Sequence, residues 1–347
     1  MAERTRIGLV GCGFFARNHL NSWRDLAGEG ALLAAVCDTD PQKAKAAATE
    51  FGAPRWYVSV DEMLAAEQLD LVDIVTRMDT HREIVSKTLA RKIPTVIQKP
   101  FAPEIEDCIA MTRLARTAGT FLAVHENFRF QKPMLRVAEL LATGAIGTPS
   151  WARLSFRTGF DVYKTQPYFL SEERLAILDI GIHILDLARV LLGEVDRISC
   201  ATQCRNPRVR AEDTATMMLE HDSGAVSIVE CTYESRRLPD AFPQTLVELE
   251  GPSGAIVLKR DFEIEITSGG NMRTETLAQP VLPWTSAPWH VAQEAVLTTC
   301  RHMLQAVRAG REAATSAVDN LKTFALAEAA YEAAAKRSVV TPRRIRI

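Results

Sequence analysis

The sequence has no long apolar run, no excess of charge of one sign and no regular cysteine pattern. No apolar stretch approaches the ~20 residues that a membrane-spanning helix needs, so we expect no membrane association. The formal net charge of −2 predicts no binding to nucleic acid, because nucleic-acid-binding proteins carry a basic excess or patch. The seven cysteines are odd in number and scattered, which argues against a disulfide framework and for a reducing compartment.

A secretory leader and a structural metal site are also missing from the pattern. Residues 1–6 are polar and lead directly into an apolar strand pattern, so we expect no secretory leader and a cytoplasmic protein. Cys200 and Cys204 form a close pair, but no second pair completes a zinc site, and we predict no bound metal.

The length and composition that remain are those of a soluble protein with two domains. At 347 residues the chain is long for one core, on a prior of roughly 150 residues per domain. Hydrophobic residues make up 47% and charged residues 24%, an ordinary globular composition. We place the first domain at 1–125 and the second at 126–347, with no repeat or low-complexity linker between them.

The first domain alternates short apolar runs with helical patterns. Continuous apolar runs such as 31–37 are typical of parallel strands, because helices cover both faces of the sheet. Asp40-Pro41 opens one helix that Gly52 closes, and Ser59 with Glu62 has capping-box spacing before another. The pattern predicts an α/β Rossmann domain with a doubly wound parallel sheet. The expected strands are 7–10, 31–37, 71–75, 94–97 and 120–124, with helices near 79–91, 103–118 and 132–143.

A glycine-rich turn sits between the first strand and the first helix, in the run Gly11-Cys12-Gly13-Phe14-Phe15-Ala16. Gly11 permits the tight turn, and Gly13 lets backbone amides approach a pyrophosphate. The helix N-terminus then offers unpaired N–H groups to the phosphates. Asp38 ends the second strand, where its carboxylate accepts hydrogen bonds from a ribose and repels a 2′-phosphate. We therefore predict NAD rather than NADP, bound by Gly11, Gly13, Phe14, Phe15 and Asp38.

The second domain loses the alternation of strands and helices. Residues 151–157 alternate with period two, and turn signals stand at 222–224 and 251–254. The pattern predicts an α+β domain with an open, mostly antiparallel sheet and a helix over 179–192 on one face. Further strands are expected near 197–204, 214–220, 225–232, 245–250 and 255–266. Helices near 291–308 and 317–336 end the chain, and they either belong to the second domain or pack back on the first.

An apolar run in the second domain carries three titratable residues, Asp179, His183 and Asp186. At 3.6 residues per turn they fall along one stripe of a helix. Burial can tune the pKa of such groups, so the stripe indicates acid–base chemistry or a metal site. The structural alternatives are a helix cap for Asp179 and a hydrogen-bonded core histidine for His183. We leave Asp186 out of the catalytic set as a partner of Arg189 or a helix-surface group.

These motifs together resemble the Gfo/Idh/MocA family of sugar and cyclitol oxidoreductases. The resemblance rests on D-x-G-x-H-x-x-D at 179–186, Gln98-Lys99-Pro100 in place of E-K-P, the string 76–81, and Asn127-Phe128-Arg129-Phe130. It implies that Lys99, Asp179 and His183 carry the chemistry and that Thr76, His81, Gln98 and Lys99 contact NAD. Histidine suits removal of a hydroxyl proton near neutral pH, and Lys99 would stabilise charge developing on the same oxygen. Lys99 then replaces Asp186 as the third member, which removes the metal alternative.

Two departures from the family pattern bear on the cofactor site. Gln98 in place of glutamate removes a negative charge beside Lys99 but keeps a similar shape and hydrogen-bonding reach. Arg77 and Met78 replace the usual Pro-Asn. Arg77 either reaches a phosphate and relaxes the preference for NAD, or is a solvated loop charge.

A polar-aromatic loop before the Asp179 helix supplies candidate sugar contacts. Carbohydrate sites combine aromatic rings with groups that pair with hydroxyls; here they would be Asn127, Asp161, Tyr163, Gln166 and Tyr168, with a plain surface loop as the alternative. The string 125–130 together with the loop 166–169 looks like a subgroup of aldose 1-dehydrogenases that act on pentoses such as D-apiose.

The sequence therefore predicts NAD-dependent oxidation of an anomeric or secondary hydroxyl of a small sugar or cyclitol, with His183 as the base. The alternatives are a redox-neutral, NAD-using glycoside-cleaving enzyme of the same fold and a non-catalytic NAD-binding sensor. We also expect a homodimer or homotetramer, because an open sheet with an apolar outer face is an association surface.

Overall fold

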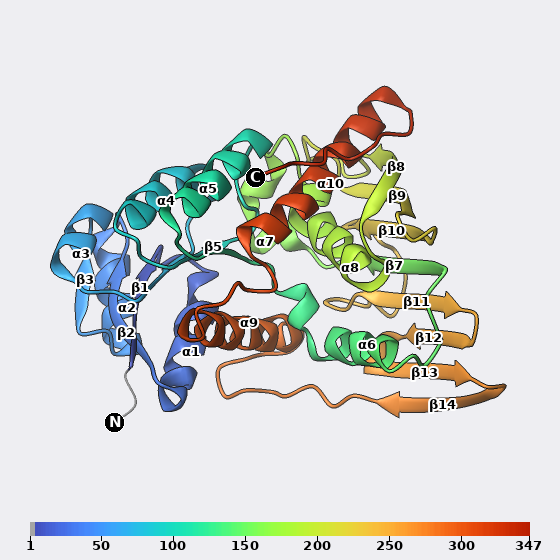
Figure 1. Cartoon of the computed structure of the whole chain (residues 1–347), viewed down its shortest axis with the longest axis horizontal. Helices are drawn as coiled ribbons and strands as arrows, with labels where there is room; N and C mark the ends of the chain where they lie inside the picture. Colours follow the sequence, from blue (N-terminus) through green and yellow to red (C-terminus); the bar gives the residue numbers. More distant parts are fainter. Residues whose placement is uncertain (1–3) are drawn as a thin grey trace. The chain divides into compact units, whose positions relative to one another are not determined.

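The computed structural model describes residues 4–347, which form two compact units. The first unit contains the described residues up to Asn127 together with Ala295–Lys322 and Ile345–Ile347, and the second contains Phe128–Glu294 and Thr323–Arg344. Two long helices, α9 (His290–Arg308) and α10 (Ala317–Lys336), contain residues of both units; Figure 1 labels the elements. Within residues 4–347, we find no helix with the length and apolar character to cross a membrane.

The first unit is built on a parallel sheet of six strands in the order β3-β2-β1-β4-β5-β6. This is the order of a doubly wound dinucleotide-binding fold, so the fold-class prediction is confirmed. The strands are β1 (Thr5–Val10), β2 (Ala31–Cys37), β3 (Arg55–Tyr57), β4 (Leu71–Ile74), β5 (Thr95–Gln98) and β6 (Leu122–His125). Strand β3 was not expected, because three residues, two of them exposed and one half-buried, are too few to show a pattern.

Local sequence explains where the helices of the first unit begin and end. The Asp40 side chain accepts hydrogen bonds from the backbone N–H of Gln42 and Lys43, and Pro41 occupies the first helical turn. Ser59 caps the next helix in the same way. The helices are α1 (Ala16–Asp25), η1 (Leu26–Glu29), α2 (Pro41–Phe51), α3 (Val60–Ala66), η2 (Met78–Thr80), α4 (His81–Ala90) and α5 (Ile105–Ala118).

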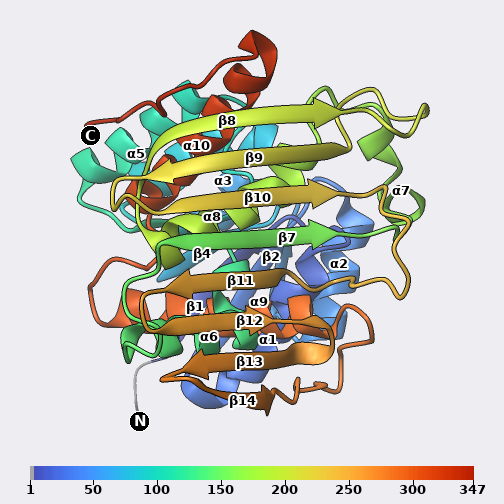
Figure 2. The ribbon, with the colours of Figure 1, turned by 90° about the vertical axis from the view of Figure 1, so that its right-hand side faces the viewer.

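The second unit is built on an eight-stranded sheet in the order β14-β13-β12-β11-β7-β10-β9-β8, seen face-on in Figure 2. Only the β7–β10 pair is parallel, so the expectation of a mostly antiparallel sheet is confirmed. The expected strand 255–266 is two strands, because the backbone turns at Asp261 with φ 62°. The strands are β7 (Trp151–Arg157), β8 (Val195–Gln203), β9 (Thr214–His221), β10 (Val226–Thr232), β11 (Leu246–Gly251), β12 (Gly254–Leu258), β13 (Glu263–Ser268) and β14 (Asn271–Thr276).

The helices of the second unit lie against one face of this sheet. Helix α8 (Ile182–Leu192) packs on β7 and β10, and α6 (Lys132–Ala142) packs on β12. The face turned to the viewer in Figure 2 carries no helix. The remaining short elements are η3 (Phe128–Phe130), α7 (Val162–Thr165), η4 (Pro167–Leu170), a π-helical turn η5 (Ile177–Gly181) and η6 (Arg260–Phe262).

The two faces of the eight-stranded sheet differ in chemistry. Along β7, Leu154 and Phe156 are buried under the helices, whereas Arg153 and Arg157 alternate with them on the other face. Both arginines pair with Glu230 of β10, at 2.6 and 2.9 Å. The outer face is therefore mixed in character rather than apolar as expected.

Candidate active site

The glycine-rich turn in the first unit is shaped by two glycines with different constraints. Gly11 has φ 94°, and a Cβ there would lie 2.6 Å from the carbonyl oxygen of Val75, so no side chain fits. A Cβ at Gly13 would meet nothing within 4 Å. Protein packing therefore does not require Gly13 to be glycine, whereas close approach of a pyrophosphate to the backbone does.

Helix α1 begins at this turn with its N–H groups uncapped by any side chain. Ala16, the first helical residue, is 1% exposed and packs closely, as the motif requires. The Phe14 and Phe15 side chains project outward and are 68% and 37% exposed. Uncapped N–H groups and the positive end of the helix dipole make this turn suitable for the phosphates of a dinucleotide.

Asp38 lies at the carboxyl end of β2 and is joined to the glycine turn. Its carboxylate accepts hydrogen bonds from the backbone N–H of Cys12 at 2.7 Å and of Asp40 at 2.9 Å. Burial, and next the charge of Asp38, raise the pKa of the Cys12 thiol to about 12, so this thiol stays neutral beside the turn. The carboxylate is thus held at the position where a ribose is bound in this fold.

The loops after β4 and β5 hold the other residues predicted to contact the cofactor. Thr76 is half-buried, and its hydroxyl accepts a hydrogen bond from the Thr80 hydroxyl at 2.7 Å. His81 is fully buried, with ring nitrogens 3.0 Å from the carbonyl oxygen of Phe101 and 3.2 Å from that of Thr76. Burial lowers the pKa of His81. Its contacts link the two loops from within the fold, which is a structural role that the sequence did not indicate.

The two unusual residues of these loops have different surroundings. Arg77 is 59% exposed in its side chain and lies 3.8 Å from Asp79, as expected of a solvated loop charge. Gln98 is 8% exposed; its Oε1 accepts a hydrogen bond from the Lys99 backbone N–H at 2.7 Å, and its Nε2 lies 2.9 Å from His19 Nε2. Lys99 is half-buried and precedes Pro100 through a cis peptide bond.

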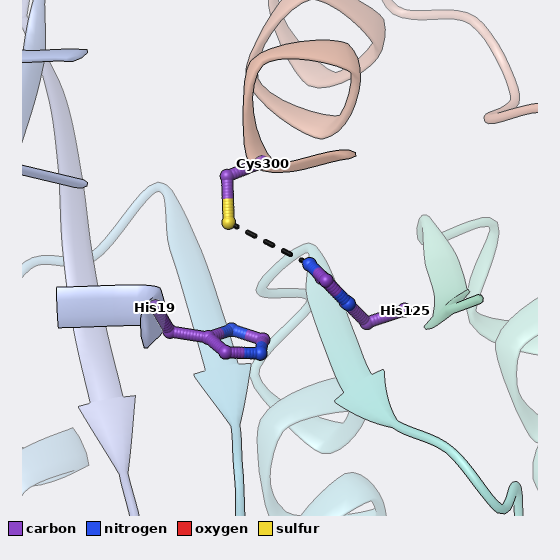
Figure 3. Close-up of side chains that lie close together, drawn as sticks. All are labelled: His19, His125 and Cys300. Carbon is purple, nitrogen blue, oxygen red and sulfur yellow. Dashed lines mark hydrogen bonds between the residues drawn. The ribbon is translucent and has the colours of Figure 1, made fainter. Parts of the chain in front are cut away.

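A histidine–cysteine cluster lies inside the first unit, where the metal-binding atoms of His19, His125 and Cys300 are within 4.8 Å of one another (Figure 3). Burial raises the pKa of the Cys300 thiol well above its usual value, and its sulfur lies 3.7 Å from His125 Nε2. The two ring nitrogens of His19 already contact Asp73 and Gln98, at 2.8 and 2.9 Å. A metal ion would have to break these hydrogen bonds, so we interpret the cluster as a hydrogen-bonded core.

In the second unit, Asp179 lies in the π-helical turn Ile177–Gly181 rather than in a regular α-helix. Helix α8 begins only at Ile182, so the single α-helix expected over 179–192 is replaced by a wide turn that continues into it. The hydroxyl of Tyr233, which follows β10, donates a hydrogen bond to the Asp179 carboxylate. Burial, and next the charge of Asp179, raise the pKa of Tyr233 well above its usual value, so the tyrosine remains a donor.

His183 follows on α8, 2% exposed, with its ring stacked on that of Phe128 at a centroid distance of 3.9 Å and an angle of 2°. The neighbouring Arg129 forms a bidentate pair with the buried Asp186, its Nε lying 2.7 Å from Oδ2. This pair ties the segment that carries Phe128 to α8. Asp186 is therefore not a helix-surface group; besides Arg129 it pairs with Arg189, as expected, with the two groups 3.8 Å apart.

The candidate sugar-binding residues of the second unit occupy the loop around α7. Asp161 caps α7 by accepting a hydrogen bond from the Lys164 N–H at 3.3 Å. Tyr163 is 6% exposed, and its hydroxyl is buried with no hydrogen-bond partner among residues 4–347. Both residues line a cavity of about 280 Å³, which Tyr233 also lines.

The other sugar-binding candidates lie elsewhere. The Tyr168 hydroxyl donates to Gln166 Oε1 at 2.7 Å in an exposed position, and neither residue lines the cavity. Asn127 is 5% exposed and is the last residue of this stretch of the first unit.

Three residues that sequence reasoning missed surround the Asp179–His183 pair. Phe128 and Arg129 lie in the string Asn127-Phe128-Arg129-Phe130, which the sequence offered as a motif without roles. Tyr233 follows an ordinary strand, and nothing in the linear sequence distinguishes it.

A doubly wound sheet with a glycine turn and an acidic residue after its second strand, joined in one chain to a sheet domain that carries Asp179 and His183, defines a two-domain NAD-binding dehydrogenase. The chain belongs to the Gfo/Idh/MocA oxidoreductase family. Residues 5–126 match the model of an oxidoreductase family with an NAD-binding Rossmann fold, and residues 134–257 match the GFO/IDH/MocA C-terminal domain.

Relatives extend the similarity over nearly the whole chain. The D-apiose dehydrogenase of Paraburkholderia graminis is 46% identical over 329 residues, which cover 95% of this chain and 87% of that protein. The D-apiose dehydrogenase of Rhizobium rhizogenes is 43% identical over 332 residues, 96% of each chain. The crystal structure of an oxidoreductase from Agrobacterium radiobacter in complex with NAD+, L-tartaric acid and magnesium has a TM-score of 0.95 at 43% identity, covering 97% of this chain and 98% of that one.

Proposed function

We propose that this chain oxidises the anomeric or a secondary hydroxyl of a small sugar with NAD, and that D-apiose is the first candidate substrate. The observation that carries the proposal is the 43–46% identity to two proteins named D-apiose dehydrogenases over almost the full chain. The chain also has Lys99, Asp179 and His183, whose side chains suit proton removal and charge stabilisation.

Each of the three residues has one task in this proposal. NAD, when bound, accepts the hydride that leaves the sugar carbon. A ring nitrogen of His183 takes the hydroxyl proton, and the Lys99 ammonium donates a hydrogen bond to the same oxygen as negative charge develops there. Asp179 accepts a hydrogen bond from a neighbouring sugar hydroxyl. The products are a carbonyl compound, which is a lactone if the anomeric hydroxyl reacts, and NADH.

Contacts within the second unit support the roles of His183 and Asp179. Stacking on Phe128 fixes the plane of the His183 ring, so its proton-accepting nitrogen has a defined direction. The Tyr233 hydroxyl donates a hydrogen bond to the Asp179 carboxylate and so helps to fix the orientation of this group.

The unpartnered hydroxyl of Tyr163 supports a sugar site beside these residues. A buried hydroxyl without a partner costs about 1–3 kcal/mol, and a sugar hydroxyl would satisfy it. Asp161 and Tyr163 both line the 280 Å³ cavity, and we assign them to the sugar.

A substrate panel tests the proposal. Purified protein is incubated with NAD and with D-apiose, other aldopentoses, aldohexoses, ketoses and inositols, and NADH absorbance is followed. We expect NADH to form with at least one aldose. Cleavage of a glycoside without net NADH would favour the redox-neutral alternative, and NAD binding without turnover of any compound would favour the sensor.

Substitutions test the three roles separately. We expect His183→Ala and Lys99→Ala to lose turnover while NAD still binds, as measured by quenching of intrinsic fluorescence. Lys336→Ala is a matched control for Lys99→Ala, because Lys336 is exposed and pairs only locally with Glu332. Full activity in either active-site variant would overturn the assignment.

We further propose that the helix-free face of the eight-stranded sheet forms a homodimer or homotetramer interface. Met218 of β9 is 41% exposed and pairs with Ile228 of β10 on this face. Such apolar side chains among ion pairs are typical of protein interfaces. Light scattering should show an oligomer for the natural chain and a smaller species for Met218→Arg; a monomeric natural chain would contradict the proposal.

A further inference from the structure

A chain of buried hydrogen bonds joins Asp73 of β4 to the backbone of Lys99 within the first unit. Asp73 Oδ2 lies 2.8 Å from His19 Nδ1, and His19 Nε2 lies 2.9 Å from Gln98 Nε2. The backbone N–H of Lys99 donates to Gln98 Oε1 at 2.7 Å. Asp73 and His19 are fully buried and Gln98 is 8% exposed, so solvent does not compete for these bonds.

The backbone N–H of Lys99 determines which atom donates and which accepts in each of these hydrogen bonds. A backbone N–H can only donate, so the oxygen of the Gln98 amide must face it and the amide nitrogen must face His19. An amide nitrogen also can only donate, so His19 Nε2 accepts with its lone pair. The single ring proton is then on Nδ1 and is donated to Asp73 Oδ2. His19 is therefore the neutral Nδ1–H tautomer.

The other groups around His19 leave Gln98 as the residue that decides its protonation. Trp23 Nε1 donates to the same oxygen of Asp73 at 2.7 Å, while Asp73 Oδ1 is buried with no partner among the described residues. The ring centroids of His125 and His19 are 4.2 Å apart, and the neutral Cys300 thiol lies nearby. The charge of Asp73 favours a second ring proton, whereas burial opposes it and the N–H of the Gln98 amide leaves that proton no acceptor at Nε2.

We propose that Gln98 is a positioning residue: its amide keeps buried His19 in the neutral Nδ1–H form, and the same amide orientation holds the backbone N–H of Lys99. The link to catalysis rests on the proposed role of Lys99, whereas the tautomer of His19 does not. The need for an N–H donor at His19 Nε2 would explain why residue 98 is glutamine. Glutamate has a similar shape, but its carboxylate cannot donate this hydrogen bond.

Replacing Gln98 by glutamate reverses the donor at His19. A carboxylate can accept from the Lys99 N–H but cannot donate to His19 Nε2, so His19 takes up a proton and donates from both nitrogens. The charges of Asp73, His19 and residue 98 still sum to −1, now with one more proton. Once that imidazolium loses its second proton, the Nε2 lone pair faces the carboxylate of residue 98, and their repulsion displaces the carboxylate and weakens its hydrogen bond with the Lys99 N–H.

The test combines NMR of the histidine ring with a pH profile of activity. With ¹⁵N-histidine labelling and His19→Gln for assignment, we expect the natural chain to show the neutral Nδ1–H pattern between about pH 5 and 8. We expect Gln98→Glu to show a doubly protonated ring that titrates. Its kcat/KM should fall, relative to the natural chain, by up to about tenfold per pH unit above that titration, with KM for NAD changed less than kcat.

A matched control is available in the second unit. Gln244 is also 8% exposed, with Oε1 bound to the Asp261 N–H and Nε2 bound to the Lys259 carbonyl oxygen. Gln244→Glu makes the same chemical change at a residue that has no hydrogen bond to a histidine among residues 4–347, and it should leave the His19 spectrum and the shape of the pH profile unchanged.

Each outcome decides the proposal. An Nε2–H or doubly protonated His19 in the natural chain would overturn it, and so would a Gln98→Glu spectrum identical to the natural one. If Gln98→Glu does not fold, the spectrum of the natural chain still decides, together with Gln98→Met, which should abolish the single-tautomer pattern. If no sugar is turned over, the proposed function fails, while the NMR result stands or falls by itself.

Discussion

Removal of the Tyr233 hydroxyl tests whether the Asp179 carboxylate must be held by its buried donor. Tyr233→Phe keeps the ring, which is 4% exposed, and deletes only the hydrogen bond to Asp179. A hydrogen bond to a charged group contributes about 1.5–3 kcal/mol. Because Asp179 is only half-buried, water replaces part of this contribution, and we take about 1.5–2 kcal/mol.

This free energy corresponds to a roughly ten- to thirtyfold fall in kcat/KM for the sugar, if the bond acts fully in the transition state. The assay is NADH formation at varied sugar concentration, with the affinity for NAD measured separately and the free energy of unfolding measured with urea. We expect NAD affinity to be unchanged, because the glycine turn and Asp38 belong to the other unit.

Tyr331→Phe supplies the control for stability. The Tyr331 hydroxyl donates to the carboxylate of Glu212 at 2.7 Å, and Glu212 keeps hydrogen bonds from the N–H groups of Leu175 and Ile177. Both variants should lose a comparable free energy of unfolding, but only Tyr233→Phe should lose activity. Equal kcat/KM in the two variants would refute the role of Tyr233 in holding Asp179.

Three further substitutions probe other parts of the structure. Gly13→Ala should leave the urea midpoint unchanged, because the added methyl meets no protein atom, yet raise the dissociation constant of NAD about tenfold or more by calorimetry, since we expect the pyrophosphate to occupy that space. Asp186→Asn should lower the free energy of unfolding by about 3 kcal/mol, because the Arg129 guanidinium, whose side chain is only 10% exposed, loses the charge of its buried partner. The Arg136 guanidinium lowers the pKa of Glu275 from 4.5 to about 2, so this pair stabilises the fold fully above pH 4.5 and less as the pH falls toward 2. In Glu275→Gln, the free energy of unfolding should fall less steeply as the pH is lowered from 4.5 to 2. The same pH dependence in the variant and the natural chain would contradict the assignment.

The first unit could be predicted well because its strands and turns are determined by residues that are adjacent in the sequence. Strands buried on both faces appear as continuous apolar runs, and the glycine turn and Asp38 follow directly from where two of those strands end. The mostly antiparallel arrangement of the second sheet could be predicted, because its turns are marked by Asp222-Ser223-Gly224 and the run 251–254. The edge strand β14 was missed, because its six residues are largely exposed and show no apolar period.

The surroundings of the candidate site were harder to predict, because they depend on partners far away in the sequence. Tyr233 reaches Asp179 over 54 positions, and Arg129 reaches Asp186 over 57. The tautomer of His19 depends on Gln98, 79 positions away. Residue type and spacing limit which groups can react, but only the packing of α8 and η3 shows what holds them.

The π-helical turn Ile177–Gly181 makes the angular relation between Asp179 and His183 depend on a single residue. A π turn contains one residue more than an α-helical turn, so removing one residue from it would leave a continuous α-helix. Everything before the deletion would then rotate by about 100° around the helix axis, carrying Asp179 away from the Tyr233 hydroxyl. An alignment or a design that treats residues 177–192 as one regular helix would therefore place the carboxylate on the wrong side, even with every residue type correct.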